Sequence, residues 1–127
     1  MACNILLFVE SRYKVSRKRI VAAVTRLLQV QGIESDVEVS VAIVGDRKMR
    51  VLNRKYRNLD KTSNVLSFPI GEGEAIRMPN DILRLGDVVI SYPEVVRECA
   101  RESMLVDDRI EELVVHGVTH LLRIHHE

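Results

Sequence analysis

Residues 36–45 carry the most regular hydrophobic pattern in the chain. In this stretch, DVEVSVAIVG, valines and an isoleucine alternate with smaller or polar residues. Strict alternation predicts a β-strand with one buried face. Residues 15–32 instead repeat apolar side chains at helical spacing and end at Gly32, which predicts a helix. The chain therefore places a helix directly before a half-buried strand.

The same two periodicities predict the remaining elements. Further strands are expected at residues 4–10, 64–70 and 85–91, with a loop at 71–84. Helices are expected after a cap at Asp46, from Pro93 to about Met104, and after a cap at Asp107 or Asp108. Because strands and helices interleave, we expect a layered α/β-type domain with one sheet of about four strands.

Length and composition limit the classes of protein. A chain of 127 residues predicts a single domain over 1–127. No apolar run approaches the roughly 20 residues that span a bilayer, so no membrane partner is expected. The N-terminal MACNILLFVES has no basic segment before its apolar stretch and is interpreted as a strand, not as a signal peptide. Cys3 and Cys99 lack disulfide or metal-type spacing, which favours a reduced, cytoplasmic protein.

The distribution of charged residues along the chain says more about possible partners than the net charge does. The formal net charge is +1, which predicts no particular partner. Residues 47–57, however, contain six basic side chains and no acidic one, whereas residues 98–112 contain six acidic side chains diluted by arginines. A basic helix can attract the backbone of a nucleic acid, and it can equally be a solvated helix face.

All four histidines lie in the final segment HGVTHLLRIHHE, residues 116–127. His116 and His120 are four apart, so a helix places both on one face at the flank of its apolar stripe. Such a pair is the usual foundation of a zinc site, although it also arises on a solvated helix face. A third ligand would be His126, with His125 as its competitor. Gly117 stands where zinc peptidases of the HExxH type carry their general base.

Three blocks of the chain match a known family. The segment VVHGVTHLLRIHH resembles the HGxLHLxGYDH signature of the YbeY-type endoribonucleases, the bacterial rRNA maturation factors, with His116, His120 and His126 on its three histidines. The segment LNRKYRNLDKTSNVLSFP, residues 52–69, is similar to a second family block that includes Arg57, Asn64 and Ser67. The segment LGDVVIS, residues 85–91, is similar to a third.

This resemblance implies a fold and an activity. It implies an α+β domain, with a small mixed sheet packed with helices and a metal site on the last long helix. The implied activity is that of a single-strand-specific, metal-dependent endoribonuclease in rRNA processing and ribosome quality control, with rRNA and the small ribosomal subunit as partners. The implied cofactor is one zinc ion on three histidines and a water.

Roles are also expected for residues outside the histidine segment. The resemblance places Arg57 at the site, where it is expected to act on charge that develops at the phosphate, because a guanidinium can grip phosphate with two N–H groups. The alternative for Arg57 is a solvated charge on a helix. Ser67 and Asn64 are expected to line the cleft or to serve a structural role at a strand edge. The residues expected to hold the RNA backbone, with a plain soluble helix face as the alternative, are Lys48, Arg50, Arg54 and Lys55. An aromatic content of 4% predicts few stacking platforms for bases.

The chain departs from the family at its third histidine. Arg123, Ile124 and His125 replace the family's Gly-Tyr-Asp, and a single residue follows His126. We expect the helix to end near Leu122, and we expect this short C-terminal end to support His126 poorly. Two alternatives therefore stand beside the endoribonuclease: a zinc-dependent hydrolase of another substrate such as a peptide, and a non-catalytic ribosome-assembly factor with an incomplete metal site. Metal content distinguishes the assembly factor from the two enzymes. Cleavage of single-stranded RNA or of a peptide distinguishes the two enzymes from each other.

Overall fold

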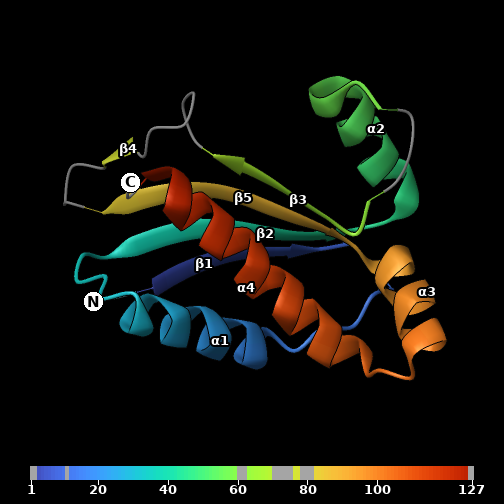
Figure 1. The fold of residues 1–127 in the computed structure, drawn as a ribbon, viewed down its shortest axis with the longest axis horizontal. Helices are drawn as coiled ribbons and strands as arrows, with labels where there is room; N and C mark the ends of the chain where they lie inside the picture. Colours follow the sequence, from blue (N-terminus) through green and yellow to red (C-terminus); the bar gives the residue numbers. More distant parts are fainter. Residues whose placement is uncertain (1–2, 11, 60–62, 70–75, 78–81, 126–127) are drawn as a thin grey trace.

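The computed structural model describes residues 3–10, 12–59, 63–69, 76–77 and 82–125. Helices and strands alternate along the chain (Figure 1). The elements are β1 (Cys3–Val9), α1 (Arg17–Val30), β2 (Val37–Val44), α2 (Asp46–Arg57), β3 (Val65–Pro69), β4 (Ile76–Arg77), β5 (Leu83–Ser91), α3 (Tyr92–Glu102) and α4 (Val106–His125). Four strands and four helices fall where the periodicity of the sequence predicts them.

The strands form one mixed sheet with the order β1-β2-β5-β3. β1, β2 and β5 are parallel, and β3 runs antiparallel to β5. The expectation of an α+β fold with a mixed sheet of about four strands is confirmed. The prediction of a loop at 71–84 is partly wrong, because the two-residue β4 pairs with the start of β5 at Leu83 and Arg84.

A glycine in β5 lets β3 approach closely. Gly86 has φ +139°, and a Cβ atom there would lie 2.2 Å from the Phe68 carbonyl oxygen. The pairing of β2 with β5 also shifts register at this point, between Glu38 and Val39. Only glycine combines this backbone conformation with the space available, which explains the Leu-Gly-Asp block of the sequence.

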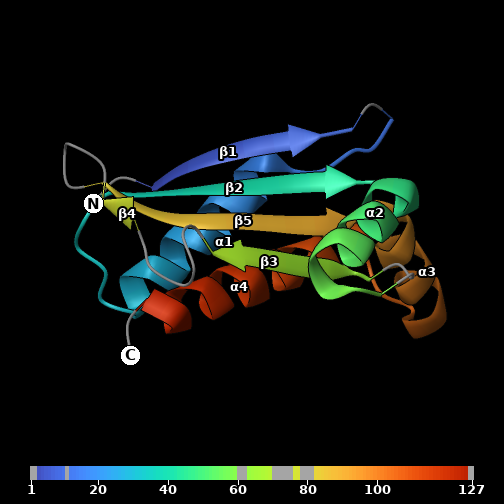
Figure 2. The ribbon, with the colours of Figure 1, turned by 90° about the horizontal axis from the view of Figure 1, so that it is seen from above.

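The two faces of the sheet are covered differently. α1 and α4 lie across one face, and their buried side chains form the main core with alternate residues of β1, β2 and β5 (Figure 1). Viewed from above, α2 is the one helix of the described residues that lies over the other face, and it covers one end of it (Figure 2). There Met49 packs with Val44, Leu66 and Val89 in a second, smaller core.

The helix ends differ from the sequence predictions in two places. Gly45 is the N-cap of α2, and Asp46 instead accepts hydrogen bonds from Ser91 Oγ and from Arg97. These contacts tie α2 to the start of α3. The bond to Asp46 and a second one to Glu94 raise the pKa of Arg97. In α4, Val106 is the first residue, so that Asp107 and Asp108 lie in the first turn and neither is the cap.

The C-terminal end of α4 also differs from the prediction. The helix was expected to end near Leu122, and it continues to His125. No glycine interrupts this segment, and the buried Leu121 and Leu122 hold it against the core. Residues 123–125 therefore continue the helix and do not form the turn that would redirect the chain. No helix within the described part of the chain is long and apolar enough to cross a membrane.

Candidate active site

A cleft of about 480 Å³ lies between the C-terminal half of α2, the edge strand β3 and α4. Its lining is formed by Tyr56, Arg57, Val65, Leu66, Ser67, Phe68, His116 and His120. The α4 residues lie about 50 positions further along the chain than those of β3, so the cleft exists only in the folded chain. Among these lining residues are two imidazoles, one guanidinium and no carboxylate.

The histidines of the cleft stand on the exposed flank of α4. His116 and His120 are separated by one helical turn, and both side chains are exposed. The opposite side of this helix is fully buried, with Val114, Val118 and Leu121 at 0% exposure. A buried apolar stripe fixes the rotation of a helix, so the core determines that both imidazoles face the cleft.

Gly117 lies between the two histidines on the buried side of α4. A Cβ atom at this position would lie 2.7 Å from a methyl carbon of Val88 and 3.1 Å from Ser67 Oγ. Ser67 Oγ also donates a long hydrogen bond, 3.5 Å, to the Gly117 carbonyl oxygen. The glycine therefore allows α4 to lie directly against β3 and β5. A glutamate here, as in zinc peptidases, would be driven into the sheet instead of into the cleft.

Arg57 is the last residue of α2 and forms the opposite wall of the cleft. The helix ends at Asn58 in the left-handed conformation, with φ 55°. Below it, the buried Asn53 donates a hydrogen bond of 2.9 Å from its side chain to Ser63 Oγ, and its carbonyl oxygen accepts one from the Leu59 N–H. These bonds hold Leu59 and Ser63 against the end of α2 and help to position Arg57.

The structure brings together four of the nine residues that the sequence suggested for the site. Arg57, Ser67, His116 and His120 line the cleft. His126 lies outside the described residues, as does the side chain of its competitor His125. The remaining four all belong to the exposed surface of α2 and are Lys48, Arg50, Arg54 and Lys55.

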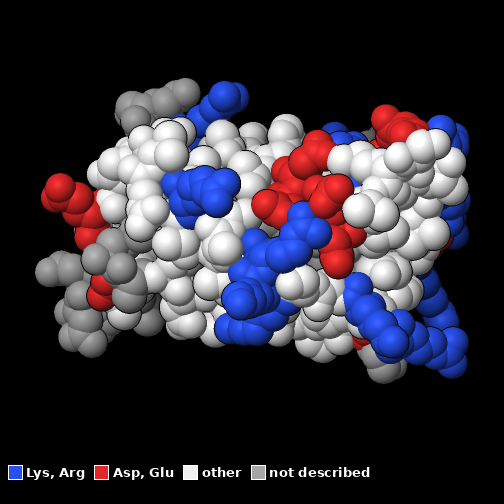
Figure 3. All heavy atoms as spheres, turned by 90° about the horizontal axis from the view of Figure 1, so that it is seen from below, with Lys and Arg blue, Asp and Glu red and all other residues white. Residues whose placement is uncertain are grey.

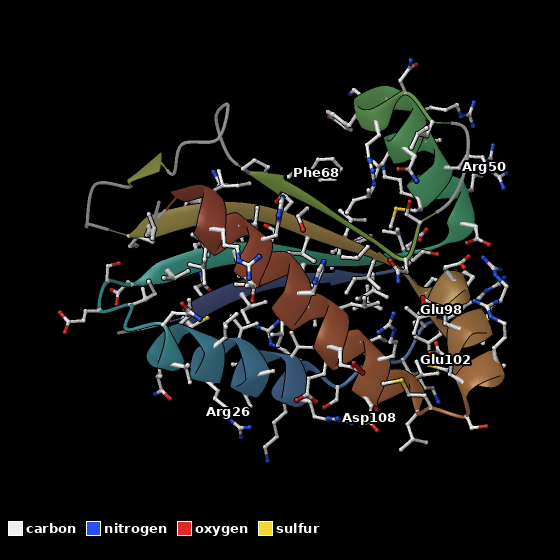
Figure 4. All side chains as sticks on the ribbon, in the orientation of Figure 1. Arg26, Arg50, Phe68, Glu98, Glu102 and Asp108 are labelled. Carbon is white, nitrogen blue, oxygen red and sulfur yellow. The ribbon has the colours of Figure 1, made fainter. Side chains whose placement is uncertain are left out.

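The α2 residues do not share one position relative to the cleft. Arg50 points away from the sheet (Figure 4). Lys48 lines a larger groove on the open face of the sheet. The Lys55 amine lies 5.2 Å from the centre of the Tyr56 ring. Asn64, also considered for the cleft, donates to the Glu98 carboxylate and so connects the start of β3 to α3.

Two aromatic residues of the site were not predicted from the sequence. Tyr56 and Phe68 line the cleft, with their ring centres 5.0 Å apart and their planes tilted by 55°. The low aromatic content suggested few stacking platforms, but two of the five aromatic residues meet here. Their positions in the sequence could have indicated this, because Tyr56 directly precedes Arg57 and Phe68 directly follows Ser67.

The donors of the cleft fit a metal that prefers imidazole ligands. Two histidines one turn apart in an exposed cleft are a suitable pair for zinc. Within the described part of the chain, no group of three or more His, Cys, Asp or Glu residues could hold a metal ion. The third ligand predicted from the sequence, His126, is not among those residues. Burial raises the pKa of the Cys3 and Cys99 thiols, which makes both poor nucleophiles.

The chain is similar in sequence and in fold to known proteins. The sequence model of the family described as Endoribonuclease YbeY matches residues 8–127. The chain is 34% identical over 120 residues to Endoribonuclease YbeY of Acinetobacter baumannii, covering 94% of this chain and 76% of that protein. It is 37% identical over 126 residues to the Desulforamulus reducens protein of that name, covering 97% and 74%. A solution structure of a Thermotoga maritima protein shares the fold, with a TM-score of 0.60, 23% identity, and coverage of 92% and 71%.

Proposed function

The chain belongs to the Endoribonuclease YbeY family, and from this premise we propose that it hydrolyses phosphodiester bonds of single-stranded RNA in the cleft between α2, β3 and α4. One observation supports this location of the active site. Arg57, at the end of α2, and the pair His116 and His120, on α4, line the same cleft although about 60 residues separate them in the sequence.

Each wall has a separate task in this proposal. Arg57 binds a non-bridging oxygen of the scissile phosphate and stabilises the negative charge that grows there. Ser67 also lines the cleft, and its hydroxyl oxygen, which donates to the Gly117 carbonyl oxygen, can accept a hydrogen bond from a ribose hydroxyl. His116 and His120, with His126, would hold a zinc ion. When bound, such an ion supplies a water of lowered pKa and a Lewis acid for phosphate oxygen.

The surface charge fits an RNA substrate that approaches from α2. The basic side chains of residues 47–57 are all exposed, and Asp46 of the same helix is paired with Arg97. The acidic side chains gather elsewhere, on the face formed by α1 and α4, beside basic ones (Figure 3). There Arg19 pairs with Asp108 and Glu111. RNA backbone is thus attracted to the α2 side of the molecule without a requirement for sequence.

The biological setting follows from the substrate. We propose rRNA as the RNA, the small ribosomal subunit as the particle that presents it, and the cytoplasm as the compartment. A peptidase of the HExxH type is disfavoured by the packing of Gly117 against Val88.

The direct test is cleavage of labelled RNA by the purified protein, with and without added zinc. We expect cleavage of a single-stranded oligonucleotide, little cleavage of the same sequence in a duplex, and none of an unfolded peptide. His120→Ala should abolish both zinc binding and cleavage while leaving the circular dichroism spectrum unchanged. Cleavage of RNA by the His120→Ala variant at the original rate would contradict the proposal, as would zinc-dependent cleavage of the peptide alone.

A further inference from the structure

A second and larger hollow, of about 940 Å³, lies on the open face of the sheet. Its floor is formed by the outward-facing residues of the strands, among them Leu6 and Phe8 of β1, Ser40 of β2 and Asp87 of β5. Leu6 is 45% and Phe8 is 60% exposed, so no element of the described chain covers this floor. Large apolar side chains that are left exposed together indicate a binding surface.

This groove borders the candidate active site. Tyr56 and Phe68 line both the groove and the histidine cleft. Phe68 stands on the side of β3 that faces away from α4 (Figure 4), whereas its neighbour Ser67 contacts α4. The two aromatic rings therefore form a shared wall at the edge strand, with the histidines on one side and the open sheet on the other.

The chemistry of the groove matches the bases of RNA more closely than it matches the backbone. Three of the five aromatic residues of the chain, Phe8, Tyr56 and Phe68, border it. Single-stranded nucleic acids bind surfaces of this kind by stacking bases on aromatic side chains. Asp87 lies exposed among the lining residues, and a carboxylate repels phosphate but accepts hydrogen bonds from base amino groups. The cations Lys48 and Arg17 also line the groove and can hold the phosphates.

We infer that the groove on the open face of the sheet is a subsite for single-stranded RNA that extends from the cleft. The nucleotides beside the scissile bond pass the wall formed by Tyr56 and Phe68, and the following bases lie on the sheet. The inference rests on the proposed function of the cleft. It adds that a short oligonucleotide fills only the cleft and that a longer one gains affinity from the groove.

The test measures equilibrium binding of fluorescent, uncleavable 2′-O-methyl RNA. Oligonucleotides of about 3 and about 12 nucleotides are compared, the longer being within the range that one nucleic-acid-binding domain covers. We expect the longer RNA to bind at least tenfold more tightly. Phe8→Ala should reduce the ratio of the two affinities by about tenfold, the effect of losing one stacked base. Lys48→Ala should reduce this ratio less, by about fivefold at low salt.

Matched controls lie on surfaces outside the groove. Leu105→Ala removes another exposed apolar side chain, and Lys18→Ala removes an exposed lysine of α1. Both should leave the ratio of affinities unchanged. Equal affinity for the short and long RNA would overturn the inference, and so would an unchanged ratio in both Phe8→Ala and Lys48→Ala. If Phe8→Ala instead dissociates a dimer in sedimentation velocity and leaves the ratio unchanged, the groove is an interface between copies.

Failure of the inference can be distinguished from failure of the proposed function. The binding test uses RNA that cannot be cleaved, so its result is independent of catalysis. The proposed function fails if His120→Ala cleaves RNA normally, whereas the subsite fails if chain length has no effect on affinity.

Discussion

The two walls of the cleft are held in position by different means. The α4 wall is continuous with the main core, because the residues behind its histidines are fully buried against β5. The α2 wall rests on the smaller core around Met49 and on the hydrogen bonds of the buried Asn53, and its exposed side chains are mostly basic. A large core therefore fixes one wall, whereas a small core and a few hydrogen bonds fix the other.

Because of this difference, we expect the two walls to respond differently to mutation. A group that must be placed at one point, such as an imidazole that binds a metal, benefits from a rigid helix in the core. An exposed ammonium group such as that of Lys55 acts over several ångströms on a phosphate chain and tolerates a softer support. Changes in α4 should consequently act through packing, and changes in α2 through charge.

Among changes that leave the histidines in place, the largest effect is expected from Arg57→Ala. Losing one preorganised donor to the developing charge should lower kcat for RNA cleavage by about 100-fold. Stability should change by less than about 0.5 kcal/mol, because the side chain is exposed at the end of α2. Cleavage kinetics and urea unfolding measure the two quantities. Arg101→Ala, which removes an exposed arginine from the last turn of α3, is the matched control and should cleave normally.

A smaller effect, on stability, is expected from Gly117→Ala in the other wall. The added methyl group meets Val88 at 2.7 Å, and the overpacking exceeds the gain in helix propensity. The net loss should be about 1 kcal/mol, with weaker zinc binding. In a double-mutant cycle, Val88→Ala should relieve the clash and give a favourable coupling of about 1 kcal/mol. Strict additivity of the two changes would show that α4 does not rest on Val88.

Ser63→Ala should loosen the α2 wall. It removes the hydrogen bond to the Asn53 side chain, at a cost of about 1 kcal/mol in the free energy of unfolding. The protein should remain folded, but kcat for RNA cleavage should fall several-fold. The reason is that the hydrogen bond helps to position Arg57. Ser35→Ala, at a partly exposed serine before β2, is a control. An unchanged rate in Ser63→Ala would mean that α2 needs no such support.

The smallest effect is expected from Lys55→Ala. Removing one phosphate contact should reduce the slope of log affinity against log salt by about 1, with little change in preference among sequences. Fluorescence titrations of single-stranded RNA at several salt concentrations give this slope. A loss of affinity that does not vary with salt would indicate that Lys55 acts instead through its contact with the Tyr56 ring.

The sequence predicted the elements of the fold and the main groups of the cleft for clear physical reasons. Alternation in β2 and helical spacing in α1 and α4 are local signals, and His116 and His120 are neighbours by helical geometry alone. Arg57 and Ser67 were placed with them only through resemblance to a family, because no local pattern reports a contact between α2, β3 and α4.

Other features depended on tertiary structure. Which face of the sheet stays open, and therefore that Phe8 and Phe68 border one groove, cannot be read from the alternation of a single strand. The helix end near Leu122 was wrong because the glycine that ends the helix in the family is absent here and the core supports further turns. Asp46 was predicted to cap α2, but Ser91 and Arg97 bind its carboxylate instead.

The place of β5 in the sheet has a consequence for the way the molecule is made. β5 pairs with β2 on one edge and with β3 on the other, yet it follows both in the chain. During synthesis, β2 and β3 leave the ribosome with unpaired edges and cannot join until β5 arrives between them. Such edges are prone to pair with other chains. The growing polypeptide is thus exposed to misassembly before β5 is made, and it holds no complete cleft that could cut RNA during that interval.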